Sequence, residues 1–345
     1  MRPGGKYFFG EFHTKMSLVD FLRRAKENSN AIMVVGNESA DLDSVCSAIV
    51  VAHSLSQSGT KFYCPLINTT KELLELRGEV VAVLERFGIS TSDLTYYTPE
   101  LVNTKQVILV DHNEITKRWI KDNVRCEVIA IYDHHADSGQ LLELNDRFIM
   151  TCASNASVLV SRKIIDEMLW FPLVWDSMCF TFRTTPLDME AKNILKGDSL
   201  DENETWSMLV ESSKSVDEAT LGPTLLLQKD LKVFQTNELT YVIPTIHISI
   251  KEEHLEALKV VASAHQASFG FICSAYLDGQ TEHSFAQELL IWHRRHDEVV
   301  YFLSKNGIQL NKLRCNQYYS VCQVLNKNFG RKQLQPLLHA FLSQK

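Results

Sequence analysis

Four apolar runs in the first half of the chain each lead into an aspartate, and one of these aspartates is followed directly by two histidines. The acidic and imidazole side chains at these four places are those of Asp41, Asp43, Asp111, Asp133, His134, His135 and Asp176. Carboxylate oxygens and imidazole nitrogens are ligands that Mg²⁺ and Mn²⁺ accept in proteins. If the four places meet in the fold, this set predicts a metal site.

The runs themselves indicate how the aspartates are brought together. They occupy residues 31–36, 107–110, 128–132 and 171–175, and they are short, continuous and apolar, with many β-branched residues. Such runs are typical of strands that are buried on both faces of a parallel sheet. Ligands of open α/β sheets bind beyond the carboxyl ends of the strands, so we expect all four places to lie at that edge.

Asp41 and Asp43 are two residues apart in a loop ahead of an apolar helix, so both carboxylates can face the same side. The alternative is that Asp43 or Ser44 only caps this helix. Asp111 follows a strand expected near the sheet centre and is our candidate for a carboxylate that bridges two metals. An isolated aspartate in that place is otherwise often a turn former or a helix cap.

The tripeptide at residues 133–135 combines an acid with two adjacent imidazoles. One imidazole can bind a metal while the other reaches a substrate oxygen, and Asp133 can hold a ring in the required tautomer. For this tripeptide alone, two solvated histidines in a loop are an equal alternative. The recurrence of aspartate at four strand ends is what favours ligation.

The order of the expected elements indicates an α/β protein of two domains. Helical stretches at 17–26, 44–56 and 71–87 alternate with the apolar runs, which predicts a doubly wound, mainly parallel sheet over residues 1–185. A polar stretch at 186–204 is expected to be a linker, and residues 205–345 a smaller α/β domain. Within that domain we expect strands at 239–250, 267–277 and 284–291 and helices at 297–304 and 332–343.

Composition narrows the class of function. The net charge of −7 argues against a general nucleic-acid or membrane-surface binder, and no apolar run is long enough for a membrane helix. The N-terminus lacks the apolar core of a signal peptide. The eight cysteines form no Cys-x-x-Cys pair, so we expect free thiols in a reducing compartment and a cytoplasmic location.

Four motifs, in this order, resemble those of the DHH phosphoesterase family. They are residues 36–44 (Gly-Asn-Glu-Ser-Ala-Asp-Leu-Asp-Ser), 110–113 (Val-Asp-His-Asn), 133–135 (Asp-His-His) and 176–177 (Asp-Ser). Near the C-terminus, Arg-Lys-Gln at 331–333 is similar to a basic signature of the same family. The likeness is to the exopolyphosphatase branch, which carries a DHHA2-type C-terminal domain.

The resemblance implies an active site in the cleft between the two domains, with two Mn²⁺ or Mg²⁺ ions as cofactors and Co²⁺ as a further option. It implies that the metal ligands are Asp41, Asp43, Asp111, His134 and Asp176. His135 would contact a substrate phosphate, and Asp133 would orient a histidine. Arg331 and Lys332 would reach the phosphate chain from the second domain, and the linker would act as a hinge.

The reaction that the resemblance implies is removal of the terminal phosphate of inorganic polyphosphate by a water that two metals activate. Asn37 stands where the manganese pyrophosphatases of this superfamily place histidine, which favours the exopolyphosphatase branch. The alternatives are a pyrophosphatase or a Prune-like hydrolase of short polyphosphates or nucleotides. More distant alternatives are a non-catalytic binding protein and a nucleic-acid exonuclease.

Two lysines of the second half remain without a functional assignment. Lys229 and Lys232 lie in a stretch that resembles a lysine-rich segment of the family. For both, a solvated helix face is the expectation.

Overall fold

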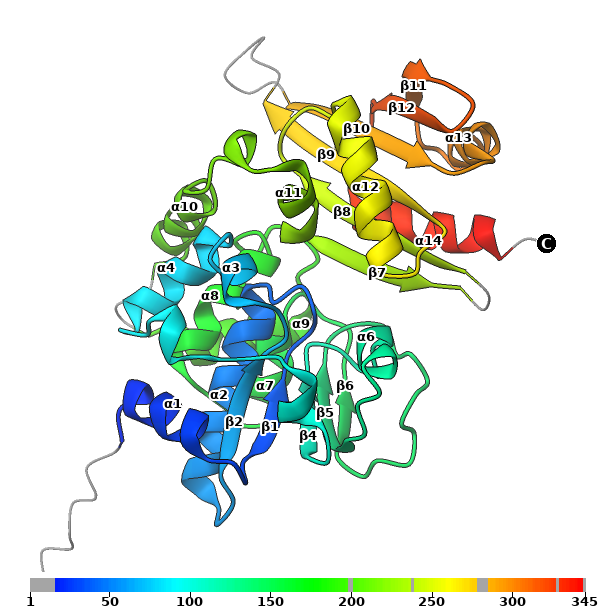
Figure 1. Ribbon diagram of the computed structural model, residues 1–345. Coiled ribbons are helices and arrows are strands. Elements are labelled where there is room, and N and C mark those ends of the chain that lie inside the picture. Colours follow the sequence, from blue (N-terminus) through cyan, green and yellow to red (C-terminus); the bar gives the residue numbers. More distant parts are fainter. Residues whose placement is uncertain (1–15, 198–200, 237–238, 278–284, 327–328, 344–345) are drawn as a thin grey trace, which may run out of the picture.

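The computed structural model describes residues 16–197, 201–236, 239–277, 285–326 and 329–343. The chain forms two domains, one above the other in Figure 1, and each is built on a six-stranded sheet. The first domain comprises the blue to green part of the chain, and the second runs from the green helix α11 (Pro223–Lys229) to the red C-terminal helix. The two-domain α/β class predicted from the sequence is therefore confirmed.

The first sheet is parallel throughout, and its strand order is β3-β2-β1-β4-β5-β6. Its strands are β1 (Ile32–Val35), β2 (Tyr63–Ile67), β3 (Thr95–Tyr96), β4 (Gln106–Val110), β5 (Glu127–Asp133) and β6 (Arg147–Ile149). From β1 the chain adds β2 and then β3 on one side of the sheet. It then crosses back, and β4, β5 and β6 follow on the other side of β1. The loops after β1 and β4 consequently diverge, and such a switch point is where open α/β sheets bind ligands.

Helices surround this sheet, and α2 is the most deeply buried of them. They are α1 (Leu18–Glu27), α2 (Leu42–Ser58), α3 (Lys71–Leu74), α4 (Gly78–Arg86), α5 (Pro99–Val102), α6 (Lys117–Lys121), α7 (Asn155–Ser161), α8 (Trp170–Asp176), α9 (Pro186–Leu195) and α10 (Glu202–Ser213). Every residue of α2 from Leu42 to Ala52 is buried. This helix is buried because β1 and β2 cover one side of it and α7 and α8 pack on it as well.

The fourth apolar run is a helix, and the strand expected at 171–175 is wrong. The segment forms α8, which follows a 3-10 turn at Glu167–Leu169 and ends at Asp176. Pro172 lies in the first turn of this helix, where a proline costs no hydrogen bond. A short apolar run that is buried on every side has the same composition as a buried strand, so composition alone does not separate the two.

Helices α9 and α10 extend the first core. Ala191 and Leu195 of α9 and Leu209 of α10 are buried in it, and α9 packs against α7 and α8. Part of the expected linker, residues 198–200, lies outside the described residues. The hinge at 186–204 and the domain limits around it stay predictions.

The second sheet has the order β11-β12-β10-β9-β8-β7, and only the β8–β9 pair is parallel. Its strands are β7 (Leu231–Gln235), β8 (Thr240–Ile246), β9 (Phe269–Leu277), β10 (Phe285–Trp292), β11 (Leu310–Cys315) and β12 (Tyr319–Val324), and its helices are α11 (Pro223–Lys229), α12 (Glu252–Ala264), α13 (His296–Lys305) and α14 (Arg331–Leu342). The expected strands correspond to β8, β9 and β10, and the expected helices to α13 and α14. Strands β7, β11 and β12 were not predicted.

Alternate residues of the second sheet serve two separate cores. Tyr241 and Ile243 of β8 pack with α13 and α14, whereas Val242 and Ile246 pack with α11 and α12. The sheet is therefore covered on both faces, and α11 also packs on α3 of the first domain (Figure 1). Among the residues that the structure describes, no helix combines the length and apolar character needed to cross a membrane.

Candidate active site

The loop between β1 and α2 places two acids at the start of a helix. Gly36 allows this loop to pack on α2, because a Cβ at this position would overlap the Ser44 hydroxyl. The backbone N–H of Asn37 donates to Oγ of Ser44 at 2.7 Å. Asp41 is the N-cap of α2 and Asp43 lies in its first turn. Both carboxylates therefore face the positive end of the helix dipole.

Asp43 is almost fully buried, and its carboxylate has polar neighbours on other elements. Its Oδ2 accepts a hydrogen bond of 2.5 Å from the backbone N–H of Asn155 and lies 3.9 Å from Nε2 of His134. Burial, followed by the negative charge of Asp111, raises its pKa to about 7. The side chain is thus held in place in a site where its negative charge is disfavoured.

Asp111 leaves the end of β4 with a left-handed backbone, at φ 59°. This conformation costs a non-glycine residue about 1–2 kcal/mol. Oδ2 accepts a 2.6 Å hydrogen bond from Nδ2 of Asn37, whereas Oδ1 is buried and accepts none. Oδ1 lies 3.2 Å from Nε2 of His134. Burial, followed by the charge of Asp41, raises the pKa of Asp111 to about 8.

The two histidines are held in different orientations. Nδ1 of His134 lies 3.1 Å from the carbonyl oxygen of Cys152, and since a carbonyl only accepts, Nδ1 carries the proton. Nε2 of His134 faces Asp43 and Asp111, at 3.9 and 3.2 Å. Burial would lower the pKa of this ring, but the nearby Asp111 carboxylate and the Cys152 carbonyl raise it well above the ordinary value. Nδ1 of His135 lies 2.9 Å from Oδ1 of Asp133, which leaves Nε2 of this half-exposed ring unengaged.

Asp133 is fully buried and contacts the ring of His135 and the backbone of His134. Its Oδ1 also accepts from the backbone N–H of His134 at 2.8 Å, and its Oδ2 accepts from Nδ2 of Asn113. Burial alone would raise its pKa, but the hydrogen bond and charge of His135 outweigh burial and lower it. Asp133 thus remains an anion that fixes imidazole orientation, as expected for a carboxylate behind a metal-binding histidine.

Asp176 is the last residue of α8 and contributes a further carboxylate. A negative charge at a helix C-terminus is unfavourable. Burial, together with the charges of Asp43 and Asp41, raises its pKa well above the ordinary value. The site thus gathers more negative charge than its own residues neutralise.

Two groups of side chains have the geometry to hold a metal ion. One is Asp111, His134 and His135 and the other is Asp43, His134 and Asp176, each with its ligand atoms within 4.8 Å of one another. His134 belongs to both groups. The buried, unpartnered Oδ1 of Asp111 and the raised pKa values fit divalent cations at these two positions. Asp41 belongs to neither group, and the individual ligand roles stay predictions.

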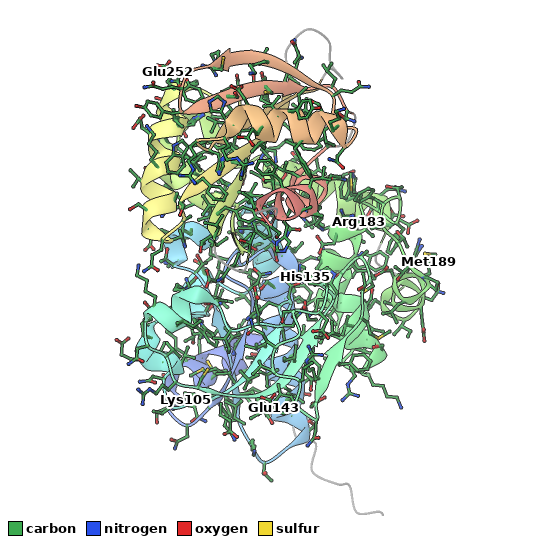
Figure 2. All side chains as sticks on the ribbon, turned by 90° about the vertical axis from the view of Figure 1, so that its right-hand side faces the viewer. Lys105, His135, Glu143, Arg183, Met189 and Glu252 are labelled. Atoms are coloured by element: carbon green, nitrogen blue, oxygen red, sulfur yellow. The ribbon has the colours of Figure 1, made fainter. Side chains whose placement is uncertain are left out.

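The second domain supplies cations next to this acidic edge. Nζ of Lys232 on β7 lies 3.6 Å from Oδ2 of Asp41. The charge of Lys332, in the first turn of α14, acts on Asp176. The guanidinium of Arg331 is directed to Asp230 of the second domain, where it donates to the backbone carbonyl and to the carboxylate. His135 lies near the middle of the molecule, between the two sheets (Figure 2).

The solvated helix face expected for Lys229 and Lys232 is wrong. Lys232 is on a strand, and Lys229 ends α11 with only 11% of its side chain exposed. Nζ of Lys229 lies 3.0 Å from Oε1 of Glu218. The strand escaped prediction because Leu-Lys-Val-Phe-Gln is an edge strand in which none of the five residues is buried.

Comparison with known proteins agrees with this arrangement. Residues 31–175 match the family model described as "DHH family, N-terminal domain". We refer to the first domain, residues 16–213 as described, as the DHH domain.

Two similar proteins are named for the hydrolysis of phosphate compounds. A "Putative exopolyphosphatase" of Schizosaccharomyces pombe is 34% identical over 127 residues, which are 35% of this chain and 33% of that protein. A "Manganese-dependent inorganic pyrophosphatase" of Methanocaldococcus jannaschii is 27% identical over 223 residues, 59% of this chain and 67% of that protein. The match to the first of these relatives thus spans only a third of its length.

A solved structure extends the likeness to both domains. The crystal structure of a "putative family II inorganic pyrophosphatase" from Methanococcus jannaschii matches with a TM-score of 0.61 and 20% identity. The match covers 90% of this chain and 99% of that chain. At this identity the comparison establishes that the fold is shared.

Two asparagines of the DHH domain were not assigned from the sequence. Oδ1 of Asn37 accepts from the backbone N–H of Ser39, which identifies it as the oxygen and turns Nδ2 towards Asp111. Asn37 therefore offers a metal no oxygen in this arrangement and instead holds Asp111. Asn113 holds Asp133 in the same way. Both asparagines lie inside the recognised motifs, next to the acids. This position is the only feature of the sequence that could have indicated their role.

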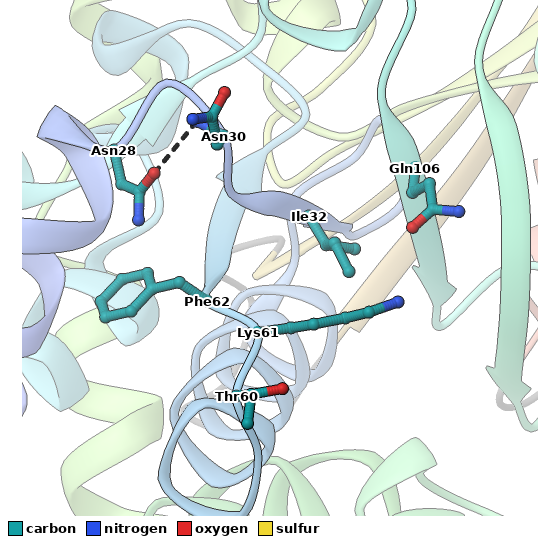
Figure 3. Close-up of a pocket in the computed structure, with 7 residues that line it drawn as sticks. All are labelled: Asn28, Asn30, Ile32, Thr60, Lys61, Phe62 and Gln106. Atoms are coloured by element: carbon teal, nitrogen blue, oxygen red, sulfur yellow. Dashed lines mark hydrogen bonds between the residues drawn. The ribbon is translucent and has the colours of Figure 1, made fainter.

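A separate hollow of about 430 Å³ lies at the opposite end of the DHH domain sheet (Figure 3). Its lining residues are Asn28, Asn30, Ile32, Thr60, Lys61, Phe62 and Gln106. Ile32 and Gln106 are the first residues of β1 and β4, so the hollow is at the amino ends of the strands. It contains one lysine and no acid or histidine, and we assign it no chemistry.

Proposed function

We propose that the protein is an exopolyphosphatase, which hydrolyses the terminal phosphate of inorganic polyphosphate and releases orthophosphate. This proposal rests on one observation. Two groups of acids and histidines that could each hold a cation share His134, and they lie beside lysines of the second domain. The acids suit divalent cations, and the lysines suit the negative charge of a phosphate chain. The S. pombe relative supports polyphosphate as the substrate.

The proposed cofactors are two Mn²⁺ or Mg²⁺ ions. Asp41, Asp43, Asp111, His134 and Asp176 would hold them, and Nε2 of His134 would bind one of the two ions. When bound, such ions supply a water of lowered pKa and neutralise charge on the phosphoryl oxygens. The manganese-dependent relative favours Mn²⁺.

The remaining side chains would bind and orient the substrate. Burial lowers the pKa of His135, and with Nδ1 bonded to Asp133 its Nε2 is free to accept a proton at the substrate. Lys232 and Lys332 would balance the charge of the phosphates as they enter. Arg331 would act from the start of α14, where Asp230 holds its guanidinium in a fixed orientation.

A pyrophosphatase is the second candidate. The shared fold and the match over 67% of a manganese-dependent pyrophosphatase favour it. Against it stands Asn37, at the position where the pyrophosphatases of this superfamily carry histidine. Its amide faces Asp111 at 2.6 Å and so occupies the place of a potential ligand.

The test is orthophosphate release from pyrophosphate, tripolyphosphate and long-chain polyphosphate with Mn²⁺ or Mg²⁺. Asp111→Asn should abolish release, whereas Asp20→Asn, a change on the exposed face of α1, should leave it intact. Release from chains of three or more phosphates, with pyrophosphate spared, is the expected result. Preference for pyrophosphate would replace the proposal by the second candidate, and no release from any of them would reject both.

A further inference from the structure

Arg77 lies in the corner between α3 and α4 of the DHH domain, and this corner is tightly fixed. The next residue, Gly78, touches α10 so closely that a Cβ would overlap the carbonyl oxygen of Ser212. The Arg77 side chain is only 8% exposed. Because this guanidinium is buried, its orientation depends on the protein groups around it and not on solvent.

The neighbours of Arg77 belong to both domains. Nη1 lies 3.7 Å from Oε1 of Glu79 in the DHH domain. Nη2 lies 3.6 Å from Oδ1 of Asp230 in the second domain, and it is buried without a hydrogen-bond partner.

Asp230 is at the same time the anchor of Arg331. Nη2 of Arg331 donates to Oδ1 of Asp230 at 3.0 Å, and Nη1 donates to the Asp230 carbonyl at 2.8 Å and to the Ile243 carbonyl at 3.2 Å. One carboxylate oxygen therefore faces two guanidinium groups from different domains. Arg331 is the first residue of α14, so the same anchor sets the position of Lys332.

We propose that Arg77 is a positioning residue that latches the DHH domain to the second domain through Asp230 and so holds Arg331 and Lys332 against the acidic edge. The latch rests on the proposed function for its effect on catalysis. Direct contact of Arg77 with substrate is disfavoured by its burial.

The charge arrangement suits a contact that opens and closes. When the domains separate, Arg77 keeps Glu79 and Asp230 keeps Arg331, so neither is left as an isolated buried charge. The Arg77–Asp230 pair at 3.6 Å is longer than the hydrogen bonds within the second domain. It therefore adds to closure without locking the two domains together.

The first experiment compares Arg77→Met with Arg125→Met, which removes an equally charged but exposed side chain of the DHH domain. With Arg77→Met we expect a larger radius of gyration in small-angle scattering and a KM for polyphosphate raised about fivefold. The kcat and the Mn²⁺ affinity measured without substrate should change less than about twofold. An unchanged radius together with an unchanged KM would overturn the latch.

The second experiment asks whether Arg77 acts through Asp230. In an Asp230→Asn background, Arg77→Met should raise KM by no more than about twofold further. If the KM of the double variant rose by the product of the two single effects, Arg77 would not act through Asp230. Should Arg77→Met fail to fold, Arg77→Lys keeps the buried charge with a shorter reach and should shift both readouts in the same direction.

Scattering and Mn²⁺ binding require no turnover. If the wild type released no orthophosphate, the proposed function would fail while the scattering comparison still tested the latch.

Discussion

The carboxylates of the two domains stand in opposite electrostatic situations. In the DHH domain, Asp43, Asp111 and Asp176 lie together, and burial and mutual repulsion raise the pKa of each. In the second domain, burial also favours protonation of Glu218 and Asp230. There, hydrogen bonds and cations outweigh burial, and both pKa values are lowered.

This difference separates acids that stabilise the fold from acids that need a ligand. Glu218 is bonded to Lys229 and His247, and Asp230 to Arg331, so each has its counter-charge within the same domain. We define the acid cluster of the DHH domain as Asp43, Asp111 and Asp176. Among the described residues, no lysine or arginine of that domain forms an ion pair with this cluster, whose recorded pairs are with histidines. An arrangement that disfavours its own ionised state is typical of a site that binds a cation.

The largest expected effect comes from His134→Ala, because His134 belongs to both donor groups. We expect Mn²⁺ affinity and orthophosphate release each to fall by at least about a hundredfold. Titration calorimetry with MnCl₂ and a phosphate-release assay measure the two quantities. His339→Ala, on the exposed side of α14, is the matched control. Unchanged Mn²⁺ affinity would contradict the assignment of the DHH-domain acids to a cation site.

Asn113→Ala should have the next largest effect, since it removes the donor to Oδ2 of Asp133. The loss leaves a buried carboxylate oxygen unpaired, and activity should fall about 10- to 100-fold. The pKa of Asp133 should rise, because the Asn113 hydrogen bond helps to lower it, and the acidic limb of the pH–rate profile should move to higher pH. Asn193→Ala on exposed α9 is the control, and an unmoved acidic limb would show that Asn113 does not act through Asp133.

The sequence was sufficient to predict the edge of the sheet where the acids meet. Three of the four runs are strands β1, β4 and β5, and alternating strand and helix patterns specify their parallel order. The fourth acid, Asp176, reaches the site from helix α8, which the apolar run did not distinguish from a strand. Its position beside Asp43 depends on tertiary packing, which local composition does not encode.

The second domain was harder to predict for a physical reason. Its two cores draw on alternate residues of the same strands, so β8, β9 and β10 are strongly apolar and recognisable. The edge strands β7 and β11 are partly or fully exposed and show no such pattern. Lys232 and Asp230 lie at one of these edges, and their contacts with the DHH domain depend on how the two domains pack.

Asp111→Asn should stabilise the protein when a chelator removes divalent ions, although it abolishes activity. Asparagine tolerates the left-handed backbone and still accepts from Asn37. The folded pKa of Asp111 is about 8, above the ordinary 3.8, so the wild type loses stability as pH rises through this interval. At pH 8 we expect the variant to be more stable by about 2 kcal/mol, and about equally stable at pH 4. Thermal unfolding at both pH values measures this, and lower stability at pH 8 would contradict it.

Glu218→Gln should have the opposite sign and the smallest effect, because Glu218 already has its partners. Its Oε1 and Oε2 accept from Lys229, from Nδ1 of His247 and from the His247 backbone N–H, at 2.7–3.0 Å. The folded pKa of Glu218 is about 2, below the ordinary 4.5, so its contribution is complete above pH 4.5 and is lost as pH falls through 2. The pKa of His247 is raised, so its share is present below about 6.5 and is lost as pH rises through the folded value.

Between these limits, at pH 5.5, the variant should be less stable by about 1 kcal/mol, and the difference should shrink towards pH 2. Thermal unfolding across this range measures it, with Glu253→Gln as the control, since Glu253 is 55% exposed in a surface pair with Lys251. A stabilised Glu218→Gln would place this acid with the acid cluster of the DHH domain. The electrostatic contrast would then no longer separate the structural acids from the functional ones.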